Sequence, residues 1–354
     1  MATVARPQQK ANDLPQLIGF GVVAVTGLAA WVVQLTQGFA TLGLGQAVAW
    51  GAYISAFFLL AGTGSGLVIL AALADLDVLP ALKSERRALL IGAIAAFVAA
   101  GFAILMDIGK PERVFNLLFS PNLSSMFVWD FWALALSIVL AAAYLVLGPK
   151  PRALPIAAAL FAAAVVIAEG FILAVTAGRP LWHSAILPVV FLVEAGITAS
   201  AVVLLLGGDD KAATLRRALA VLLPIALLLS LLELVTVGYG GNPDARAAMN
   251  LLTGGALAPL YWGQILLGIV LPFVLLVWAA NNRSAVMAAA VLAFIGVFVA
   301  KFVLLVAGQA LPFMGAPATY MPTLIELAGL VGMLGLAAFL FVLGKRYLPA
   351  RYGA

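Results

Sequence analysis

Seven acidic or basic side chains lie within the long apolar runs of this sequence or at their ends. They are Asp107, Asp130, Glu169, Glu194, Glu233, Lys301 and Glu326. Ionisable side chains are costly inside a lipid bilayer, where they usually pair with one another or line a functional pathway. A buried carboxyl group can accept or release a proton, and a lysine can donate a hydrogen bond to an oxygen atom. The set therefore predicts proton-handling chemistry at a polar site within a membrane.

The elements that must position this site are transmembrane helices. The chain has 354 residues, of which 65% are hydrophobic and only 9% are charged, whereas a soluble domain has roughly a quarter charged residues. So much apolar surface cannot be shielded by folding alone, so lipid must surround the chain. Runs of roughly 20 apolar residues are long enough to span a bilayer. They predict an all-α, polytopic membrane protein of about ten helices in helical bundles, near 16–36, 47–74, 87–107, 127–147, 153–177, 184–206, 215–237, 259–280, 284–307 and 322–343.

Basic residues are unevenly distributed between the loops on the two sides of these helices. Fourteen lysines and arginines lie on the side of the N-terminus and four on the other, and Lys301 within a span completes the 19. The excess of basic residues in cytoplasmic loops predicts that both termini are cytoplasmic. Residues 1–15 and 344–354 would be tails around a transmembrane domain at 16–343. The net charge of +5 follows from this pattern and does not indicate nucleic-acid binding.

The first apolar run follows Arg6 and Lys10, as the apolar part of a signal peptide would. It has no convincing small-residue cleavage site. We therefore interpret it as a retained helix.

The ionisable side chains are expected in the outer halves of their helices, away from the cytoplasm. In helices that run outward the charged residue lies towards the end, as Glu169 and Lys301 do. In helices that run inward it lies near the start, as Asp130 and Glu326 do, and Glu194 is closest to the midplane. We expect these groups to converge in one shallow pocket that exchanges protons with the outer aqueous phase. The alternative is that Lys301 pairs with one glutamate and only locks the bundle.

The composition excludes several ways of carrying electrons. Cysteine is absent, which excludes disulfides, thiolate zinc sites and an iron–sulfur cluster held by this chain. The single histidine, His183, cannot form a bis-histidine haem site, so a His–Met haem is the remaining haem alternative. We predict no metal site and no haem. A quinone headgroup would suit the pocket, because its carbonyl oxygens need hydrogen-bond donors and its redox reaction needs proton acceptors. Its isoprenoid tail can lie between helices in lipid.

Four groups of residues, in order along the chain, resemble motifs of one family of membrane proteins. They are Trp50–Ile54 with the glycine-rich 61–66; Met106–Arg113 with Ser124, Ser125, Met126 and Trp129; Gly178–His183 with Leu187, Pro188 and Phe191; and Gly308, Gln309, Tyr320–Thr323 and Glu326. Together they resemble the NrfD/PsrC family, the polysulfide reductase membrane subunits, in its longer branch of roughly ten helices. The similarity covers roughly residues 45–345.

The resemblance implies a non-autonomous subunit of a quinone-linked oxidoreductase complex in a bacterial inner membrane. It implies two four-helix bundles plus extra helices, with menaquinone or ubiquinone reacting near the outer face. It also implies that a ferredoxin-like iron–sulfur subunit docks on the periplasmic face, usually together with a molybdopterin catalytic subunit. Electrons would then pass directly between the quinone and the partner's cluster. The chain departs from the family in having less histidine to offer near the quinone.

The pattern of ionisable residues and the family resemblance together predict the site. For headgroup binding and proton transfer we select Asp107, Glu169, Glu194 and Lys301. Further residues expected to contact the quinone are Trp50, Tyr53, Arg179, His183, Glu233, Tyr320 and Glu326. His183 is expected at the outer start of a helix, where a histidine is usually ordinary surface but also has a suitable pKa range for proton exchange.

Two other functions compete with this prediction. A ten-helix secondary transporter would place its site near the midplane and show similarity between its halves, and neither feature is visible in this sequence. A passive membrane anchor would use the polar residues only to hold its helices together.

Overall fold

The computed structural model describes residues 7–206, 209–311 and 320–348, and within these ranges the regular structure is entirely helical. Parts of the predicted tails and of the loop at 308–321 lie outside the described residues. Ten helices in the described ranges are long and apolar enough to span a membrane, as predicted. They are α1 (Pro7–Gln37), α2 (Ala52–Asp75), α3 (Arg86–Asp107), α5 (Met126–Leu147), α6 (Ala153–Ala174), α7 (Leu187–Leu206), α8 (Asp209–Tyr239), α10 to α11 (Ala258–Trp278), α12 (Arg283–Ala310) and α13 (Leu324–Tyr347).

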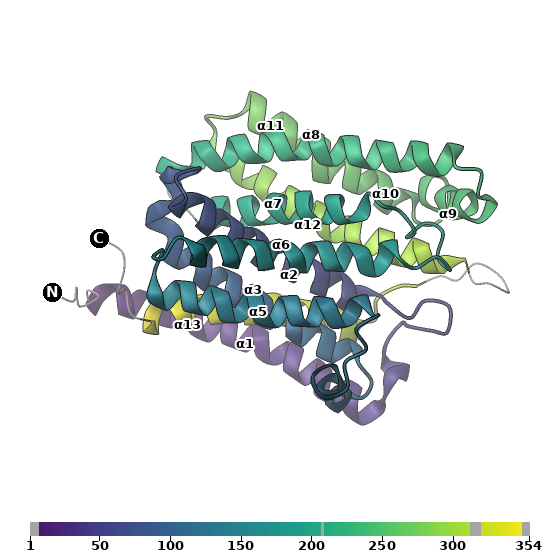
Figure 1. Cartoon of the computed structure of the whole chain (residues 1–354), viewed down its shortest axis with the longest axis horizontal. Coiled ribbons are helices and arrows are strands. Elements are labelled where there is room, and N and C mark those ends of the chain that lie inside the picture. The colour runs from purple at the N-terminus through teal and green to yellow at the C-terminus, as the bar shows by residue number, and fades with distance from the viewer. Residues whose placement is uncertain (1–6, 207–208, 312–319, 349–354) are drawn as a thin grey trace.

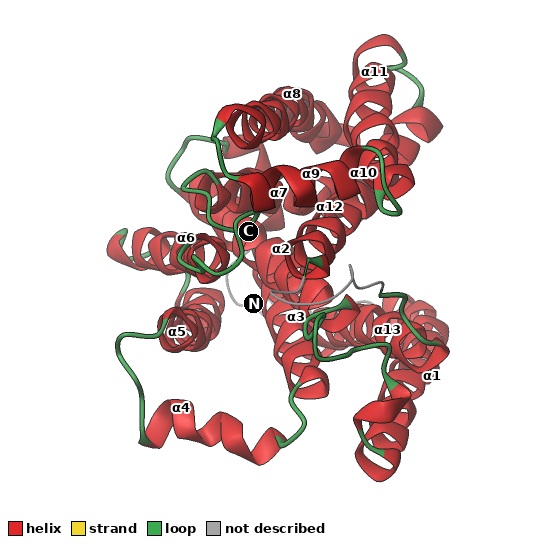
Figure 2. Cartoon of the chain, turned by 90° about the vertical axis from the view of Figure 1, so that its right-hand side faces the viewer, coloured by secondary structure: helices red, strands yellow, loops and turns green. Residues whose placement is uncertain are grey.

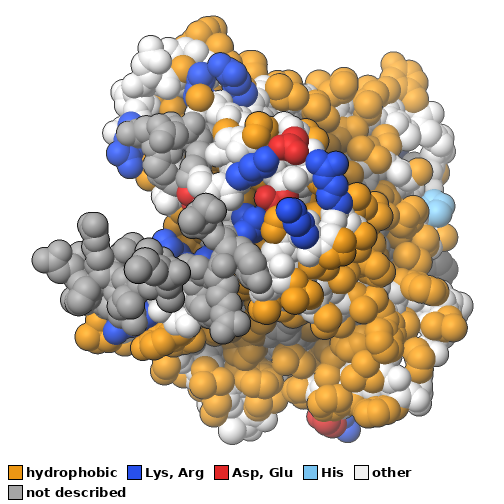
Figure 3. All heavy atoms as spheres, turned by 60° about the vertical axis from the view of Figure 1, so that its left-hand side comes forward, with side chains coloured by type: hydrophobic (Ala, Val, Ile, Leu, Met, Phe, Trp, Pro, Cys, Tyr) orange, Lys and Arg blue, Asp and Glu red, His pale blue; other side chains and the backbone are white. Residues whose placement is uncertain are grey.

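Successive spans run in opposite directions, so the start of α1 and the end of α13 lie at the same end of the molecule (Figure 1). We call this end the inner end, and the opposite end, where α1, α3, α6, α8 and α12 finish, the outer end. Lysine and arginine side chains gather on the inner end (Figure 3). Several pair with carboxylates there: Asp77 lies 2.5 Å from Lys83 and 3.5 Å from Arg152. The distribution matches the alternation of basic loops in the sequence.

The spans form two four-helix groups and a separate pair. The first group is α2, α3, α5 and α6, and the second is α7, α8, α10 to α11 and α12. Helix α2 joins them because it also contacts α7 and α12. Helices α1 and α13 pack on each other outside both groups, and α13 rests on α3 (Figure 2). This arrangement agrees with the two bundles implied by the resemblance.

Helix α2 is the most buried span, and small residues let its neighbours approach it closely. A side chain at Gly66 would collide with the carbonyl of Ala195 on α7, and one at Gly64 would collide with Phe97 on α3. The glycine-rich stretch in α2 therefore serves helix packing, as small residues commonly do in membranes.

The outer end carries most of the structure between the spans. A short helical turn, η1 (Phe39–Thr41), precedes α2, and α9 (Pro243–Thr253) follows α8. Between α3 and α5 the chain forms η3 (Pro111–Phe115) and α4 (Asn116–Phe119). We call residues 108–125 the arm, because it extends away from the bundle (Figure 2). The side chains of Phe115, Phe119 and Leu123 in the arm are exposed.

The predicted span at 47–74 begins later than expected, at Ala52. The backbone N–H groups of Ala49 and Trp50 donate to the side-chain oxygen of Gln309, at 2.9 and 3.0 Å, rather than to a helical partner. The preceding residues therefore fold over the outer end. Hydropathy alone does not reveal this tertiary contact.

Candidate functional site

The ionisable side chains gather in two separate groups rather than in the single pocket expected from the sequence. The Lys301 group contains Asp130, Glu169, Glu194, Glu233 and Lys301, and it draws one residue from each of α5, α6, α7, α8 and α12. The Asp107 group contains Tyr53, Asp107, Tyr320 and Glu326, where α2, α3 and the start of α13 meet. Within each group the residues are close enough to interact electrostatically.

The centre of the Lys301 group is a buried ion pair between α12 and α7. The Nζ atom of Lys301 lies 2.5 Å from Oε2 of Glu194, and both side chains are almost completely buried. The same ammonium lies 2.7 Å from the centre of the Phe191 ring, one turn before Glu194 on α7. An aromatic face stabilises a cation electrostatically. The lysine is therefore held by one carboxylate and one ring.

Glu169 on α6 is a second acid beside this pair. It lines the same narrow gap as Glu194 and Lys301. Glu169 is fully buried, and neither of its carboxyl oxygens has a hydrogen-bond partner. It also interacts electrostatically with Asp130 on α5. One lysine thus faces more than one acid, so at least one carboxyl can be protonated without breaking the ion pair.

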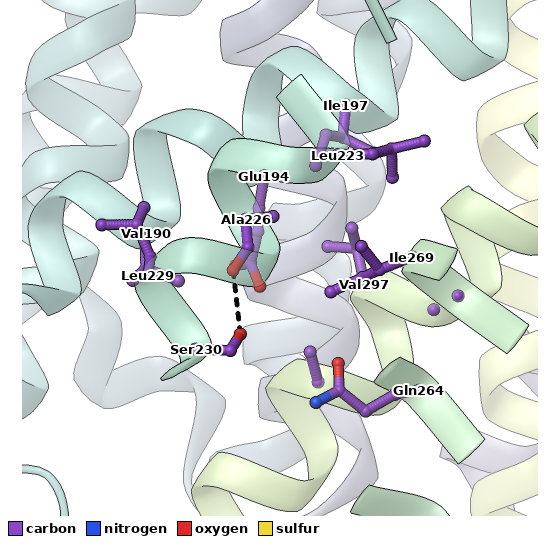
Figure 4. Close-up of a pocket in the computed structure, with 13 residues that line it drawn as sticks. Val190, Glu194, Ile197, Leu223, Ala226, Leu229, Ser230, Gln264, Ile269 and Val297 are labelled. Atoms are coloured by element: carbon purple, nitrogen blue, oxygen red, sulfur yellow. Dashed lines mark hydrogen bonds between the residues drawn. The ribbon is translucent and has the colours of Figure 1, made fainter. Parts of the chain in front are cut away.

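A cleft between α7, α8, α10 and α12 reaches the ion pair from the other side. It encloses about 560 Å³, including space open to the surroundings, and is lined by Glu194, Ser230, Glu233, Tyr261 and Gln264 among apolar side chains. A further space of about 380 Å³ continues it and shares Glu194, Ser230 and Gln264 (Figure 4). The Ser230 hydroxyl donates to the carbonyl of Ala226 at 3.0 Å. Glu233 keeps one shielded oxygen, Oε1, without a partner.

The wall of this cleft contains a break in regular helix. Leu266–Val270 form a π-helical turn between α10 and α11. Pro272 has no N–H, so it cannot donate to the carbonyl of Gly268 as an α-helix would require. At the same place Gly268 packs directly on Gly296 of α12, where a side chain on either residue would collide with the other backbone. The turn and the two glycines bring Gln264 and α12 together around the cleft.

The Asp107 group lies at the outer end. Asp107 is the last residue of α3, and its Oδ1 atom is shielded from solvent and has no hydrogen-bond partner. Asp107 interacts electrostatically with Glu326 and with the hydroxyl of Tyr53. The Tyr53 hydroxyl donates weakly to the carbonyl of Ile325, at 3.4 Å. Asp107 is therefore the member of this group with an oxygen free to bind something else.

Glu326, by contrast, has every partner it needs. It caps α13 together with Thr323, whose N–H donates to its Oε2 at 2.9 Å. The N–H of Gly43 donates to the same oxygen at 2.8 Å, and the Tyr320 hydroxyl donates to Oε1 at 2.5 Å. Burial and this hydrogen bond raise the pKa of Tyr320. The Tyr320 oxygen in turn accepts from the N–H of Ala52 at 3.0 Å. Glu326 and Tyr320 thus fasten the chain before α2 to the start of α13.

Trp50, Arg179 and His183 lie at a third place, where the turn after α6 meets the end of α12. The Trp50 ring stacks on Trp182 at 5.5 Å, and Trp182 donates to the carbonyl of Leu304. Arg179 donates to the carbonyl of Gln309 at 3.3 Å, and a ring nitrogen of His183 lies 2.7 Å from the carbonyl of Ala174. These contacts fasten the turn after α6 to backbone carbonyls of α6 and α12, and the structure does not bring these side chains to either ionisable group.

Several serine and glutamine side chains that were not selected from the sequence occupy key positions. Gln309 binds the backbone of residues 49 and 50, and Ser230 and Gln264 line the cleft. Gln34 on α1 is buried beside Asp107, where its amide donates to the carbonyl of Met106. An amide inside an apolar run was the signal that could have revealed Gln34.

The available groups fit a quinone or quinol headgroup chemically. The free oxygens of Asp107, Glu169 and Glu233 can accept hydrogen bonds from hydroxyl groups. The Tyr53 hydroxyl can donate to a carbonyl oxygen. Among the described residues there is no cluster of three side chains that could hold a metal ion.

Comparisons with known proteins give the family of this chain. It is 27% identical to a putative dimethyl sulfoxide reductase membrane subunit of Halobacterium salinarum, over 94% of this chain and 91% of that protein. It is 24% identical to the Hdr-like menaquinol oxidoreductase integral membrane subunit of Archaeoglobus fulgidus, over 92% and 91%, and 27% identical to one of the polysulfide reductase chains of Wolinella succinogenes, over 74% and 95%. Residues 41–312 match the family described as polysulphide reductase, NrfD, and this multi-pass membrane chain therefore belongs to that family.

Proposed function

We propose that this chain is the quinone- or quinol-reactive membrane subunit of a multi-subunit oxidoreductase, with its outer end facing the periplasm. The named relatives include a menaquinol oxidoreductase subunit and chains of two reductases. By analogy, an iron–sulfur subunit would dock at the outer end and connect the quinone to a catalytic subunit. The excess of basic residues at the inner end supports cytoplasmic termini.

The position of Asp107 carries this proposal. Its free Oδ1 lies at the very end of α3, directly before the exposed arm. Electron tunnelling falls steeply with distance, so a headgroup that exchanges electrons with a docked protein must lie close to that protein. Glu194 lies seven residues inside α7, and Lys301 lies nine residues before the end of α12. At about 1.5 Å per residue they are roughly 10–14 Å deeper than the helix ends.

Asp107 is thus assigned the contact with the headgroup. A quinol supplies two electrons and two protons on oxidation, and a quinone takes up the same number on reduction. The Asp107 carboxylate accepts a hydrogen bond from a headgroup hydroxyl and takes its proton, or returns one in the opposite direction. The Tyr53 hydroxyl, which interacts with Asp107, would donate to an oxygen of the headgroup in place of its weak bond to the Ile325 carbonyl.

The Lys301 group is assigned to holding and passing protons below the headgroup. Lys301 neutralises Glu194, and Glu169 beside them has two oxygens without partners. A proton on Glu169 leaves the ion pair intact, so the group can change its charge by one without losing its central contact. The cleft with Ser230, Glu233 and Gln264 gives this group polar neighbours for exchange.

The test replaces Asp107 by asparagine and measures quinol-linked turnover of the intact complex. Asp107→Asn keeps the size of the side chain but removes the proton acceptor, so turnover should fall by about a hundredfold, as for loss of a general base. Asp77→Asn is the matched control, because Asp77 is an exposed aspartate at the inner end. Normal turnover of Asp107→Asn in a fully assembled complex would remove Asp107 from the mechanism. Wild-type complex that reduces or oxidises artificial dyes but never quinones would identify a passive anchor instead.

A further inference from the structure

Three polar atoms in the contact between α1 and α3 are shielded from solvent and have no hydrogen-bond partner. They are Nε1 of Trp31, Oε1 of Gln34 and Oδ1 of Asp107. Leaving a buried donor or acceptor unpaired costs free energy, because the group has lost its hydrogen bonds to water and gained none in return. Helices that only need to pack in lipid can avoid this cost with apolar side chains. These three atoms therefore have hydrogen-bonding capacity that a ligand could use.

The contacts place Trp31 and Gln34 against the last turns of α3. The Gln34 amide nitrogen donates to the carbonyl of Met106, so the other end of the same amide is held beside Asp107. Trp31 lies one turn earlier on the same face of α1. Its ring packs edge-on against Phe102, one turn before Met106 on α3, with centroids 5.3 Å apart. Successive turns of α1 thus contact successive turns of α3 at the outer end.

Helix α13 fixes α1 in this position. Gly27 of α1 and Gly332 of α13 touch through their backbones, and a side chain on either would collide with the other helix. Gly329, one turn earlier on α13, faces the Tyr53 hydroxyl and the end of the Met106 side chain. Residues of α1, α2 and α13 therefore meet at the end of α3, where Asp107 lies.

The unpaired atoms complement a quinone in both of its redox states. The indole N–H of Trp31 can only donate, which suits a carbonyl oxygen. The amide oxygen of Gln34 can only accept, which suits a hydroxyl of the reduced form. The Asp107 carboxyl donates when protonated and accepts when ionised.

We propose that α1 supplies Trp31 and Gln34 as ligands of the quinone headgroup at Asp107. This inference rests on the proposed function. Helix α1 ends at Gln37, before the family match begins at residue 41. The two side chains thus belong to a part of the chain that the family match does not include, and they would set the affinity and selectivity of the headgroup site.

The first experiment uses a photoreactive azidoquinone on the purified wild-type complex, followed by identification of the labelled peptides. We expect label on the α1 peptide that contains Trp31 and Gln34, and competition by unlabelled quinone. Label restricted to peptides of α2 or α3 would overturn the role of α1 while leaving the proposed function intact. Absence of any competed label on this chain would instead count against the proposed function itself.

Two substitutions then test the ligands separately. Trp31→Phe keeps an aromatic ring against Phe102 but removes the N–H, and Gln34→Leu keeps the side-chain size but removes the acceptor. Each should raise the KM for quinol by about two- to tenfold, the effect of one hydrogen bond, while kcat changes little. Gln37→Leu is the control, because Gln37 is an exposed glutamine on the same helix. Unchanged KM values in both variants would show that neither side chain binds the quinone.

Discussion

Lys301 has more acidic neighbours than it can neutralise. Glu194 is its ion-pair partner, and Glu169 lines the same narrow gap with both carboxyl oxygens unpaired. Removing one partner of a buried ion pair leaves an uncompensated charge, whereas removing both often costs little. Replacing only Lys301 or only Glu194 should therefore destabilise this region more than replacing both residues together.

We predict that Lys301→Met destabilises the protein by about 3–5 kcal/mol and that the double variant with Glu194→Gln recovers most of this loss. Thermal unfolding in detergent, followed by tryptophan fluorescence, measures both. Glu194→Gln alone is the second single variant, which completes a double-mutant cycle. A double variant as unstable as the sum of its single variants would show that the two side chains do not act together.

The types and depths of these residues could be predicted from the sequence, but their grouping could not. Depth follows from position along an apolar run, which is how Glu169 and Lys301 were expected in the outer halves. Which helix faces which is set by packing between residues far apart in the chain. Asp107 thus interacts with Glu326 from α13, rather than joining Lys301 in one pocket. Gln34 was not predicted because the search within apolar runs was limited to ionisable side chains, and α1 lies outside the motifs of the family resemblance.

At the scale of elements, the chain before α2 is held by side chains from the end of the sequence. Tyr320 connects the N–H of Ala52 to Glu326, and Gln309 binds the backbone at residues 49 and 50. These contacts explain why α2 starts at Ala52 although its apolar run starts earlier. Hydropathy predicts that a helix exists, whereas its first residue depends on partners that only the fold provides.

We predict that Tyr320→Phe loosens this connection without unfolding the bundle. The Ala52 N–H and one Glu326 oxygen lose their shared partner, so the local opening free energy should fall by about 1–3 kcal/mol. Hydrogen exchange measured by mass spectrometry should show faster exchange for peptides covering residues 42–53 and little change in the interior of α2. Tyr239→Phe, at an exposed tyrosine of the outer end, is the control. Equal exchange in both variants would contradict the role of Tyr320.

At the scale of the whole molecule, alternation of basic loops and apolar runs was enough to predict ten spans with both ends on one side. Both the hydropathy signal and the charge signal can be read from position along the chain, because every helix must cross the same thickness of bilayer. The pairing of α1 with α13 outside the two bundles could not be obtained in this way. It depends on backbone contacts such as Gly27 with Gly332, which carry no charge or hydropathy signal.

The absence of cysteine makes the orientation and the docking surface directly measurable. Phe119→Cys places one thiol on the exposed arm, and Val78→Cys places one at the exposed inner end. If the outer end faces the periplasm, a membrane-impermeant maleimide should label position 119 in spheroplasts, and position 78 only after permeabilisation. Labelling at 119 should also fall several-fold when the iron–sulfur subunit is co-expressed, because that subunit would cover the arm. The reverse labelling pattern would invert the topology, whereas correct topology without protection at 119 would place the docking surface elsewhere on the outer end.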